Sequence, residues 1–222
     1  MSGDDLGDYL ERTLGHRPRD LPLFERALTH SSTGPDSYER LEFLGDRVLG
    51  LIVARWLYER FENEPEGKLS RRFNVLVARD SCGAIGREIG LPARVKLGKQ
   101  AREDGANQSD NVIGDVVEAL IGALFLEAGF EVAERFVRRL WEPLLESQGG
   151  APKHPKSALQ EFAAARGLSG PHYELVGRTG AHHNPRFTVS VTVKGAGEAS
   201  AEGSTKQEAE TAAAEKLLGE LK

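Results

Sequence analysis

Acidic side chains recur at helical spacing in the segment Tyr38–Gly50, which reads YERLEFLGDRVLG. On a helix with about 100° per residue, Glu39, Glu42 and Asp46 fall within about 60° of one another. Apolar residues occupy most of the remaining circumference, namely Leu41, Leu44, Val48, Leu51 and Ile52. The segment therefore predicts a stripe of carboxylates on a helix that is otherwise apolar.

The segment Asn111–Glu127 repeats this arrangement. Asp115 and Glu118 lie on one stripe, which Asn111 and Gly122 extend in the two directions. Hydrophobic residues fill nearly all other positions, so this helix is expected to be buried in the core. Its two carboxylates would then be partly removed from water as well.

Burying carboxylates side by side is unfavourable, because two like charges about 4 Å apart repel by roughly 4 kcal/mol at an effective dielectric near 20. A basic partner, a raised pKa or a divalent cation must offset this repulsion. Neither stripe contains His or Cys, so Mg²⁺ or Mn²⁺ is favoured over zinc or iron. We therefore predict that the two stripes face each other across one metal site. Gly50 and Gly122, one turn past the acids, are expected to let the helices approach closely.

The alternative is that the acids of the first stripe form salt bridges along the helix with Arg40, Arg47 or Arg55. A single acidic triplet would leave that alternative open. Two stripes, each extended by a glycine on an otherwise apolar helix, favour the metal site over it.

Residues 4–145 predict a mostly helical domain. Apolar positions recur with helical periodicity in five stretches separated by Gly, Pro, Asn and Asp, at 21–31, 38–62, 68–90, 109–128 and 131–146. We expect this all-α domain to cover residues 1–147 and a flexible linker rich in Gly and Pro to cover 148–156.

The remainder, residues 157–222, predicts a small α+β domain in the order α-β-β-β-α. The middle strand is the clearest, because Phe187, Val189, Val191 and Val193 alternate with polar residues. The expected elements are a helix at 157–167, strands at 172–177, 186–194 and 198–203, and a helix at 205–221.

The composition disfavours several classes of protein. No apolar run approaches the ~18 residues of a membrane span, and the first residues lack the basic and apolar regions of a secretory signal. Cys82 is the only cysteine in the 222 residues, which excludes an intrachain disulfide framework. The net charge of −5 argues against a generic nucleic-acid binder, although residues 153–222 carry 9 Lys and Arg against 8 Asp and Glu. These features predict a cytoplasmic protein without a membrane segment.

Glu39–Asp46 (ERLEFLGD) resembles the signature segment of the ribonuclease III family, and Asp115–Ala123 (DVVEALIGA) resembles that family's second acidic helix. Glu66–Ser70, followed by Leu76 and Val77, is similar to the segment between them. The resemblance implies metal-binding roles for Glu42, Asp46, Asp115 and Glu118. It ties Asp46 and Glu118 most directly to cleavage and places Glu39 and Glu66 near the scissile strand.

The same resemblance implies an endonuclease that cuts both strands of an RNA duplex as a homodimer, leaving a 5′-phosphate, a 3′-hydroxyl and a short 3′ overhang. A divalent cation can activate a water molecule and stabilise the leaving 3′-oxygen. The expected cofactor is Mg²⁺, with Mn²⁺ able to substitute, and no organic cofactor is expected. The expected substrates are structured ribosomal, messenger and other RNA precursors. Apolar residues around Phe24–Leu28 and Leu41–Leu44 are expected to supply much of the dimer interface.

The α-β-β-β-α tail resembles a double-stranded RNA-binding domain, a module that recognises the A-form duplex over ~16 base pairs. The resemblance places RNA contacts at Ser157, Gln160, Glu161, His182, His183, Thr205 and Lys206. The last helix departs from the family pattern, because Gln207 and Glu208 follow Lys206 where basic residues are usual. Fewer cations predict modest affinity of the isolated tail for duplex RNA and a shallow salt dependence.

Two other functions compete with this hypothesis. A protein that binds duplex RNA without cutting it would be expected to lack some of the four metal carboxylates, and all four are present. A helical phosphohydrolase acting on small nucleotides would usually have His among its ligands and would have no use for the RNA-binding tail. The absence of His from the acidic stripes also disfavours metal-free acid–base cleavage through a 2′,3′-cyclic phosphate.

Overall fold

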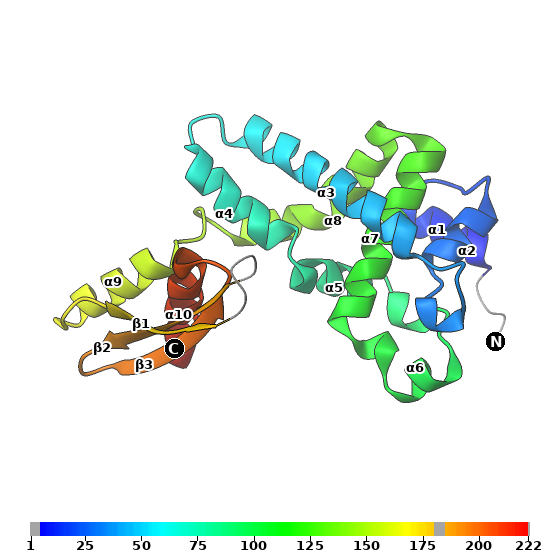
Figure 1. Ribbon diagram of the computed structural model, residues 1–222. Helices are drawn as coiled ribbons and strands as arrows, with labels where there is room; N and C mark the ends of the chain where they lie inside the picture. The colour runs from blue at the N-terminus through cyan, green and yellow to red at the C-terminus, as the bar shows by residue number, and fades with distance from the viewer. Residues whose placement is uncertain (1–4, 180–184, 222) are drawn as a thin grey trace. The chain divides into compact units, whose positions relative to one another are not determined.

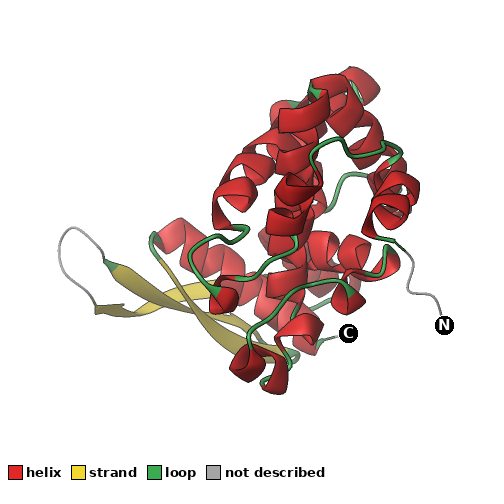
Figure 2. Cartoon of the chain, turned by 90° about the vertical axis from the view of Figure 1, so that its right-hand side faces the viewer, coloured by secondary structure: helices red, strands yellow, loops and turns green. Residues whose placement is uncertain are grey.

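The computed structural model of the chain describes residues 5–179 and 185–221 (Figure 1). It divides into two compact units, Met1–Ala151 and Pro152–Lys222. The described part of the first unit is helical, and the second contains the three-stranded sheet (Figure 2). The predicted succession of an all-α domain and a small α+β domain is therefore confirmed. None of the described helices combines the length and apolarity that a membrane span requires.

The helices of the first unit are α1 Leu6–Leu14, α2 Leu21–Ala27, α3 Glu39–Arg60, α4 Glu66–Leu76, α5 Arg79–Glu88, α6 Lys99–Glu103, α7 Asp110–Ala128 and α8 Phe130–Ser147. Short 3₁₀ turns lie at Ser31–Thr33, Leu91–Ala93 and Ala106–Gln108. The stretch 68–90, expected as one helical segment, is two helices. Ala78 between them is extended (φ −64°, ψ 148°), and the Ser81 hydroxyl donates to the Val75 carbonyl at 2.6 Å.

Helix α7 forms the centre of the first unit, since it packs against α2, α3, α5 and α8. Its hydrophobic side chains are buried from Ile113 to Leu124. This confirms the sequence-based expectation of a core helix and explains why its polar positions are confined to one stripe. Trp141 of α8 is also buried, and its indole Nε1 donates to the Leu76 carbonyl at 2.8 Å, which ties α8 to the end of α4.

The second unit consists of α9 Pro155–Ala165, β1 His172–Thr179, β2 Arg186–Val193, β3 Gly197–Gly203 and α10 Lys206–Glu220. The strands form an antiparallel sheet in the order β1-β2-β3. As the alternation predicts, Val189, Val191 and Val193 are buried, and the last two pack with residues of α9 and α10 in one core. Helix α9 begins at Pro155, inside the segment expected to be linker, because proline suits the first helical position and His154 Nδ1 accepts from the Lys156 amide at 3.3 Å.

Candidate metal centre

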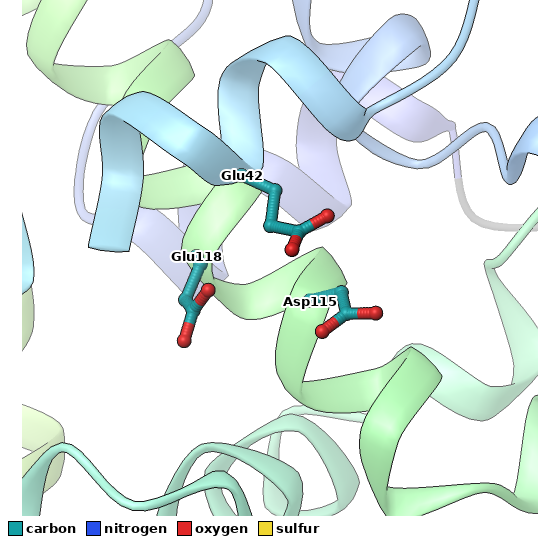
Figure 3. Close-up of side chains that lie close together, drawn as sticks. All are labelled: Glu42, Asp115 and Glu118. Carbon is teal, nitrogen blue, oxygen red and sulfur yellow. The ribbon is translucent and has the colours of Figure 1, made fainter. Parts of the chain in front are cut away.

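Helices α3 and α7 bring three carboxylates together: Glu42 from α3, and Asp115 and Glu118 from α7 (Figure 3). One carboxylate oxygen from each lies within 4.8 Å of the other two. All three side chains are half-buried. The two acidic stripes of the sequence therefore meet at one site.

A close contact between glycines lets the two helices share this site. A Cβ atom on Gly45 would collide with the Glu118 carbonyl oxygen and lie 2.9 Å from the Gly122 amide nitrogen. A Cβ on Gly122 would likewise collide with the Leu41 carbonyl oxygen. Only residues without a Cβ allow the backbones this close, so the crossing point holds Glu42 and Glu118 on facing turns.

The expectation that Gly50 would be the glycine of α3 at this crossing is wrong. A Cβ on Gly50 would lie 3.6 Å from the Phe73 ring of α4, which is an ordinary contact. The sequence does hold a signal for Gly45, because a glycine within a helix costs about 1 kcal/mol relative to alanine and therefore needs a packing reason.

Asp46 lines the same cavity, which has a volume of about 410 Å³, but lies outside the group of three. Its Oδ2 accepts a hydrogen bond from Arg47 Nη1. The salt-bridge alternative therefore describes Asp46 in this structure, whereas Glu42 has no such arginine partner among the described residues. Phe43, Arg47, Val77 and Arg79 complete the lining of the cavity.

Burial raises the pKa values of all three carboxyl groups, and repulsion by neighbouring carboxylates adds to the rise for Glu42 and Glu118. Burial raises the pKa of Glu118 to about 7, and the charges of Asp46, Asp115 and Glu42 add to the effect. Burial is also the largest cause of the raised pKa values of Glu42 and Asp115. The nearby charge of Arg79 opposes the shift in all three groups.

The donor set fits a hard divalent cation. The grouped ligand atoms are all carboxylate oxygens, which suit Mg²⁺ or Mn²⁺. A cation would also offset the repulsion that raises the pKa values. The Tyr38 hydroxyl donates to Asp115 Oδ2 at 3.3 Å, which orients that carboxylate.

Glu39 and Glu66 do not line the cavity in this chain. Glu39 is exposed in the first turn of α3, where its Oε2 accepts from the Ser37 hydroxyl at 3.3 Å. Glu66 is exposed in the first turn of α4, where its Oε1 accepts from the Ser70 hydroxyl at 2.5 Å. Within this chain, neither of these acids belongs to the group of carboxylates formed by Glu42, Asp115 and Glu118.

The residues expected to contact RNA lie mostly on the two helices of the second unit. Ser157, Gln160 and Glu161 are exposed on α9, whereas His182 and His183 lie outside the described residues. Thr205 caps α10, because its Oγ1 accepts from the Glu208 amide at 3.1 Å. Lys206 is exposed with its Nζ 3.8 Å from Glu210 Oε1.

Glu208 is a feature of this surface whose structural role the sequence did not reveal. Its Oε2 accepts from the Ser204 amide at 2.8 Å and also contacts the Ser204 hydroxyl. The start of α10 is therefore capped by a carboxylate of the chain itself, at the end where a helix attracts anions. The pattern Ser204-x-x-x-Glu208 was available in the sequence, but this cap depends on the side-chain conformation.

Comparisons with known proteins agree with this architecture. Residues 20–144 match the family described as Ribonuclease-III-like, and residues 155–221 match the double-stranded RNA binding motif. Ribonuclease 3 of Zymomonas mobilis is 60% identical over 218 residues, which cover 98% of this chain and 89% of that protein. Ribonuclease 3 of Rhodobacter capsulatus is 45% identical over 221 residues, covering 98% and 96% respectively.

A solved structure of the nuclease domain of ribonuclease III from Campylobacter jejuni, described as flexible in the region involved in dimer formation, matches with a TM-score of 0.60 and 36% identity. The match covers 61% of this chain and 96% of that domain. Fold and site thus define a helical, metal-dependent nuclease joined to a double-stranded RNA-binding domain. The chain belongs to the ribonuclease III family, whose members are endoribonucleases specific for double-stranded RNA.

Proposed function

We propose that this chain hydrolyses phosphodiester bonds of duplex RNA at a Mg²⁺ centre held by Glu42, Asp115 and Glu118, with Asp46 as a fourth ligand. Mn²⁺ can substitute, and the products carry a 5′-phosphate and a 3′-hydroxyl. The observation that carries the proposal is the meeting of three carboxylates from two helices within 4.8 Å. When bound, the cation supplies an activated water and stabilises the leaving 3′-oxygen.

The side chains of the cavity divide the remaining tasks. Glu42 and Glu118 come from facing turns of α3 and α7, which meet in the close backbone contact at Gly45 and Gly122. Tyr38 fixes Asp115 through its hydroxyl. Asp46 joins the ligands when Arg47, which is exposed, rotates away from it. Asp46 and Glu118 are assigned the most direct part in cleavage, while Glu39 and Glu66 lie outside the cavity and act toward the RNA strand or the second subunit.

The test is cleavage of a long RNA duplex by the purified chain. With Mg²⁺ we expect discrete double-strand cuts whose products accept a 3′-ligation adapter without prior phosphatase treatment. With chelator, or with single-stranded RNA of the same sequence, we expect no cuts. Cleavage that persists in chelator would overturn the metal-carboxylate mechanism, and intact duplex with Mg²⁺ would favour a protein that only binds RNA.

The natural substrates are proposed to be structured ribosomal, messenger and other RNA precursors in the cytoplasm. The second unit supports this breadth, since modules of its kind recognise duplex shape with little reading of bases. Cys82 is buried and unpaired, which suits a reducing compartment.

We propose a homodimer whose interface uses one of the two segments expected from the sequence, Leu41–Leu44, and not the other, Phe24–Leu28. Phe24 and Leu28 are 0% and 1% exposed, so they belong to the core and cannot form an interface. A groove of about 780 Å³ lies beside them instead, and its apolar lining is Leu23, Leu41, Phe43, Leu44 and Leu126. Phe43 is 66% and Leu126 is 56% exposed. A second copy related by a two-fold axis would cover both, because such an interface uses the same patch twice.

The groove predicts the effect of a charge at its apolar wall. The wild-type chain should elute at twice its 24.2 kDa mass, and Leu126→Glu should elute as a monomer at micromolar concentration, because the new carboxylate would have to be buried against the apolar side chains of the second copy. Tyr58→Glu is the matched control, since Tyr58 is 75% exposed on α3 and does not line the groove. Size-exclusion chromatography with light scattering measures both. A wild-type chain that is monomeric and fully active would contradict the proposed homodimer.

The Glu208 carboxylate that caps the start of α10 predicts weak RNA binding. Replacing it with lysine is expected to strengthen that binding. In chelator, the wild-type chain should bind duplex RNA with a log–log salt slope shallower than about −4. Glu208→Lys should tighten binding about 10-fold at low salt and steepen the slope by about 1, because a repulsive charge is replaced by a phosphate contact.

Glu215→Lys is the matched control for this effect, because it makes the same charge change at an exposed position two turns further along α10. Fluorescence anisotropy at several salt concentrations measures the affinities of both variants. Equal tightening by the two would assign the effect to net charge rather than to the start of the helix.

A further inference from the structure

Arg79 is the first residue of α5, and it lines the metal cavity together with the carboxylates of α3 and α7. With Val77, which follows the last residue of α4, it forms one wall of that cavity. Its side chain is exposed and makes no ion pair within 4.0 Å to any residue in the described ranges. Arg47, the other arginine of the lining, is already bound to Asp46.

The charge of Arg79 acts on the carboxylates of the cavity and also on any cation that they bind. Its charge acts on Glu42, Asp115 and Glu118, since it opposes the rise in each of their pKa values. The same charge repels any cation that those carboxylates bind. An unpaired guanidinium beside a metal cluster therefore lowers metal affinity, unless an anion enters the cavity and lies between the two positive charges.

The expected anion is the RNA phosphodiester itself, so this step rests on the function proposed above. We propose that Arg79 binds a non-bridging oxygen of the reacting phosphate from the start of α5, in the cavity that Glu42, Asp115 and Glu118 also line. A guanidinium offers several N–H donors in a planar fork that matches phosphate oxygens. Arg79 thereby orients the phosphate in the cavity and contributes to binding of the reacting strand.

An alternative role for Arg79 predicts a different effect of its removal on cleavage. If Arg79 only offsets carboxylate charge, its removal should leave cleavage at saturating metal unchanged. If it binds phosphate, its removal should reduce cleavage even at saturating metal, and metal binding without RNA should stay equal or become tighter. The two roles thus separate when metal binding and cleavage are measured independently.

The experiment compares Arg79→Ala, Arg79→Lys and the control Arg17→Ala in the full chain. Arg17 is 64% exposed, pairs with Glu11 and Asp8, and does not line the cavity. Titration with Mn²⁺ followed by electron paramagnetic resonance, without RNA, gives metal affinity. Single-turnover cleavage of a short duplex at saturating Mg²⁺ gives the rate.

We expect Arg79→Ala to bind Mn²⁺ at least as tightly as wild type and to cleave about 10- to 100-fold more slowly, the loss of one or two charge-assisted hydrogen bonds. Arg79→Lys should recover part of the rate, and Arg17→Ala should match wild type. Equal cleavage by wild type and Arg79→Ala overturns the inference but leaves the proposed function intact. A parallel loss of Mn²⁺ affinity, or an equal loss in Arg17→Ala, also overturns it. Failure of wild type to cleave overturns the proposed function and this inference with it.

Discussion

Replacing Gly45 with alanine is expected to destabilise the protein by about 3 kcal/mol, near the upper end of the cost of overpacking a core. The added methyl group would collide with the Glu118 carbonyl oxygen, and that oxygen belongs to helix backbone. A flexible side chain could turn aside, but here the whole of α3 or α7 must shift. The gain of up to about 1 kcal/mol in helix propensity is too small to offset this.

The same shift should lower cleavage at least about 100-fold in the folded fraction, because catalysis depends on geometry within about 1 Å. Glu118 lies at the contact itself, so separating the helices draws it away from Glu42. Urea unfolding and single-turnover cleavage at 15 °C measure the two effects. Gly122→Ala, on the other side of the contact, should show the same losses of stability and of cleavage as Gly45→Ala.

Gly50→Ala is the matched control, since it lies in the same helix and would meet only the Phe73 ring at 3.6 Å. We expect it to be as stable as wild type or slightly more stable, with unchanged cleavage. If Gly45→Ala is as stable and as active as Gly50→Ala, the close contact between α3 and α7 does not determine the geometry of the metal centre.

The spacing of acids in the sequence predicts which side chains meet but does not predict how the helices touch. Around α3, Gly45 lies about 60° from Glu42 and about 100° from Asp46. The closest contact between α3 and α7 therefore lies beside the acidic stripe and not on it. The acids consequently face the cavity at an angle, which leaves room for a ligand. Gly50 lies within the stripe, which made it the obvious candidate for the contact. Choosing between the glycines requires the packing of α4, because Phe73 occupies the space in front of Gly50.

The sequence left other features undecided for similar reasons. Hydrophobicity alone does not separate a core residue such as Phe24 from an exposed one such as Phe43, since both lie in apolar segments. Arg47 was one of three arginines that could pair with the acidic stripe, and side-chain conformation decides that it contacts Asp46. The fold class was predictable, because periodicity and turn residues act locally, whereas these contacts depend on elements far apart in the chain.

Replacing Glu118 with glutamine is expected to reduce cleavage by about 1000-fold, because the several kcal/mol that a divalent cation contributes depend on its ligands. The same change should stabilise the metal-free protein at pH 8. Burial raises the pKa of Glu118 to about 7 in the folded protein. A carboxyl with a raised pKa is protonated more readily when folded, so its ionised form opposes folding. This penalty is absent below the usual pKa, grows as the pH rises toward 7, and stays constant above it.

Thermal unfolding in chelator at pH 4.5 and at pH 8 tests whether the ionised form of Glu118 opposes folding. Glu118→Gln should melt at the same temperature as wild type at pH 4.5 and at a higher temperature at pH 8. Added Mg²⁺ should then raise the melting temperature of wild type at pH 8 more than that of the variant, because ligand binding stabilises the folded state. Glu131→Gln, an exposed acid in the first turn of α8, is the control and should show neither effect.

The combination of outcomes separates a functional carboxylate from a structural one. A carboxylate that held the fold together through a salt bridge would lower stability when neutralised, most strongly at pH 8. Glu118 has no hydrogen bond or ion pair to a basic side chain among the described residues, and its carboxylate neighbours repel it. Loss of activity together with a gain in metal-free stability is the pattern of a site that is strained until its ligand binds. If Glu118→Gln destabilised the metal-free protein at pH 8, Glu118 would be a structural residue, and the metal centre would have to be assigned to other acids.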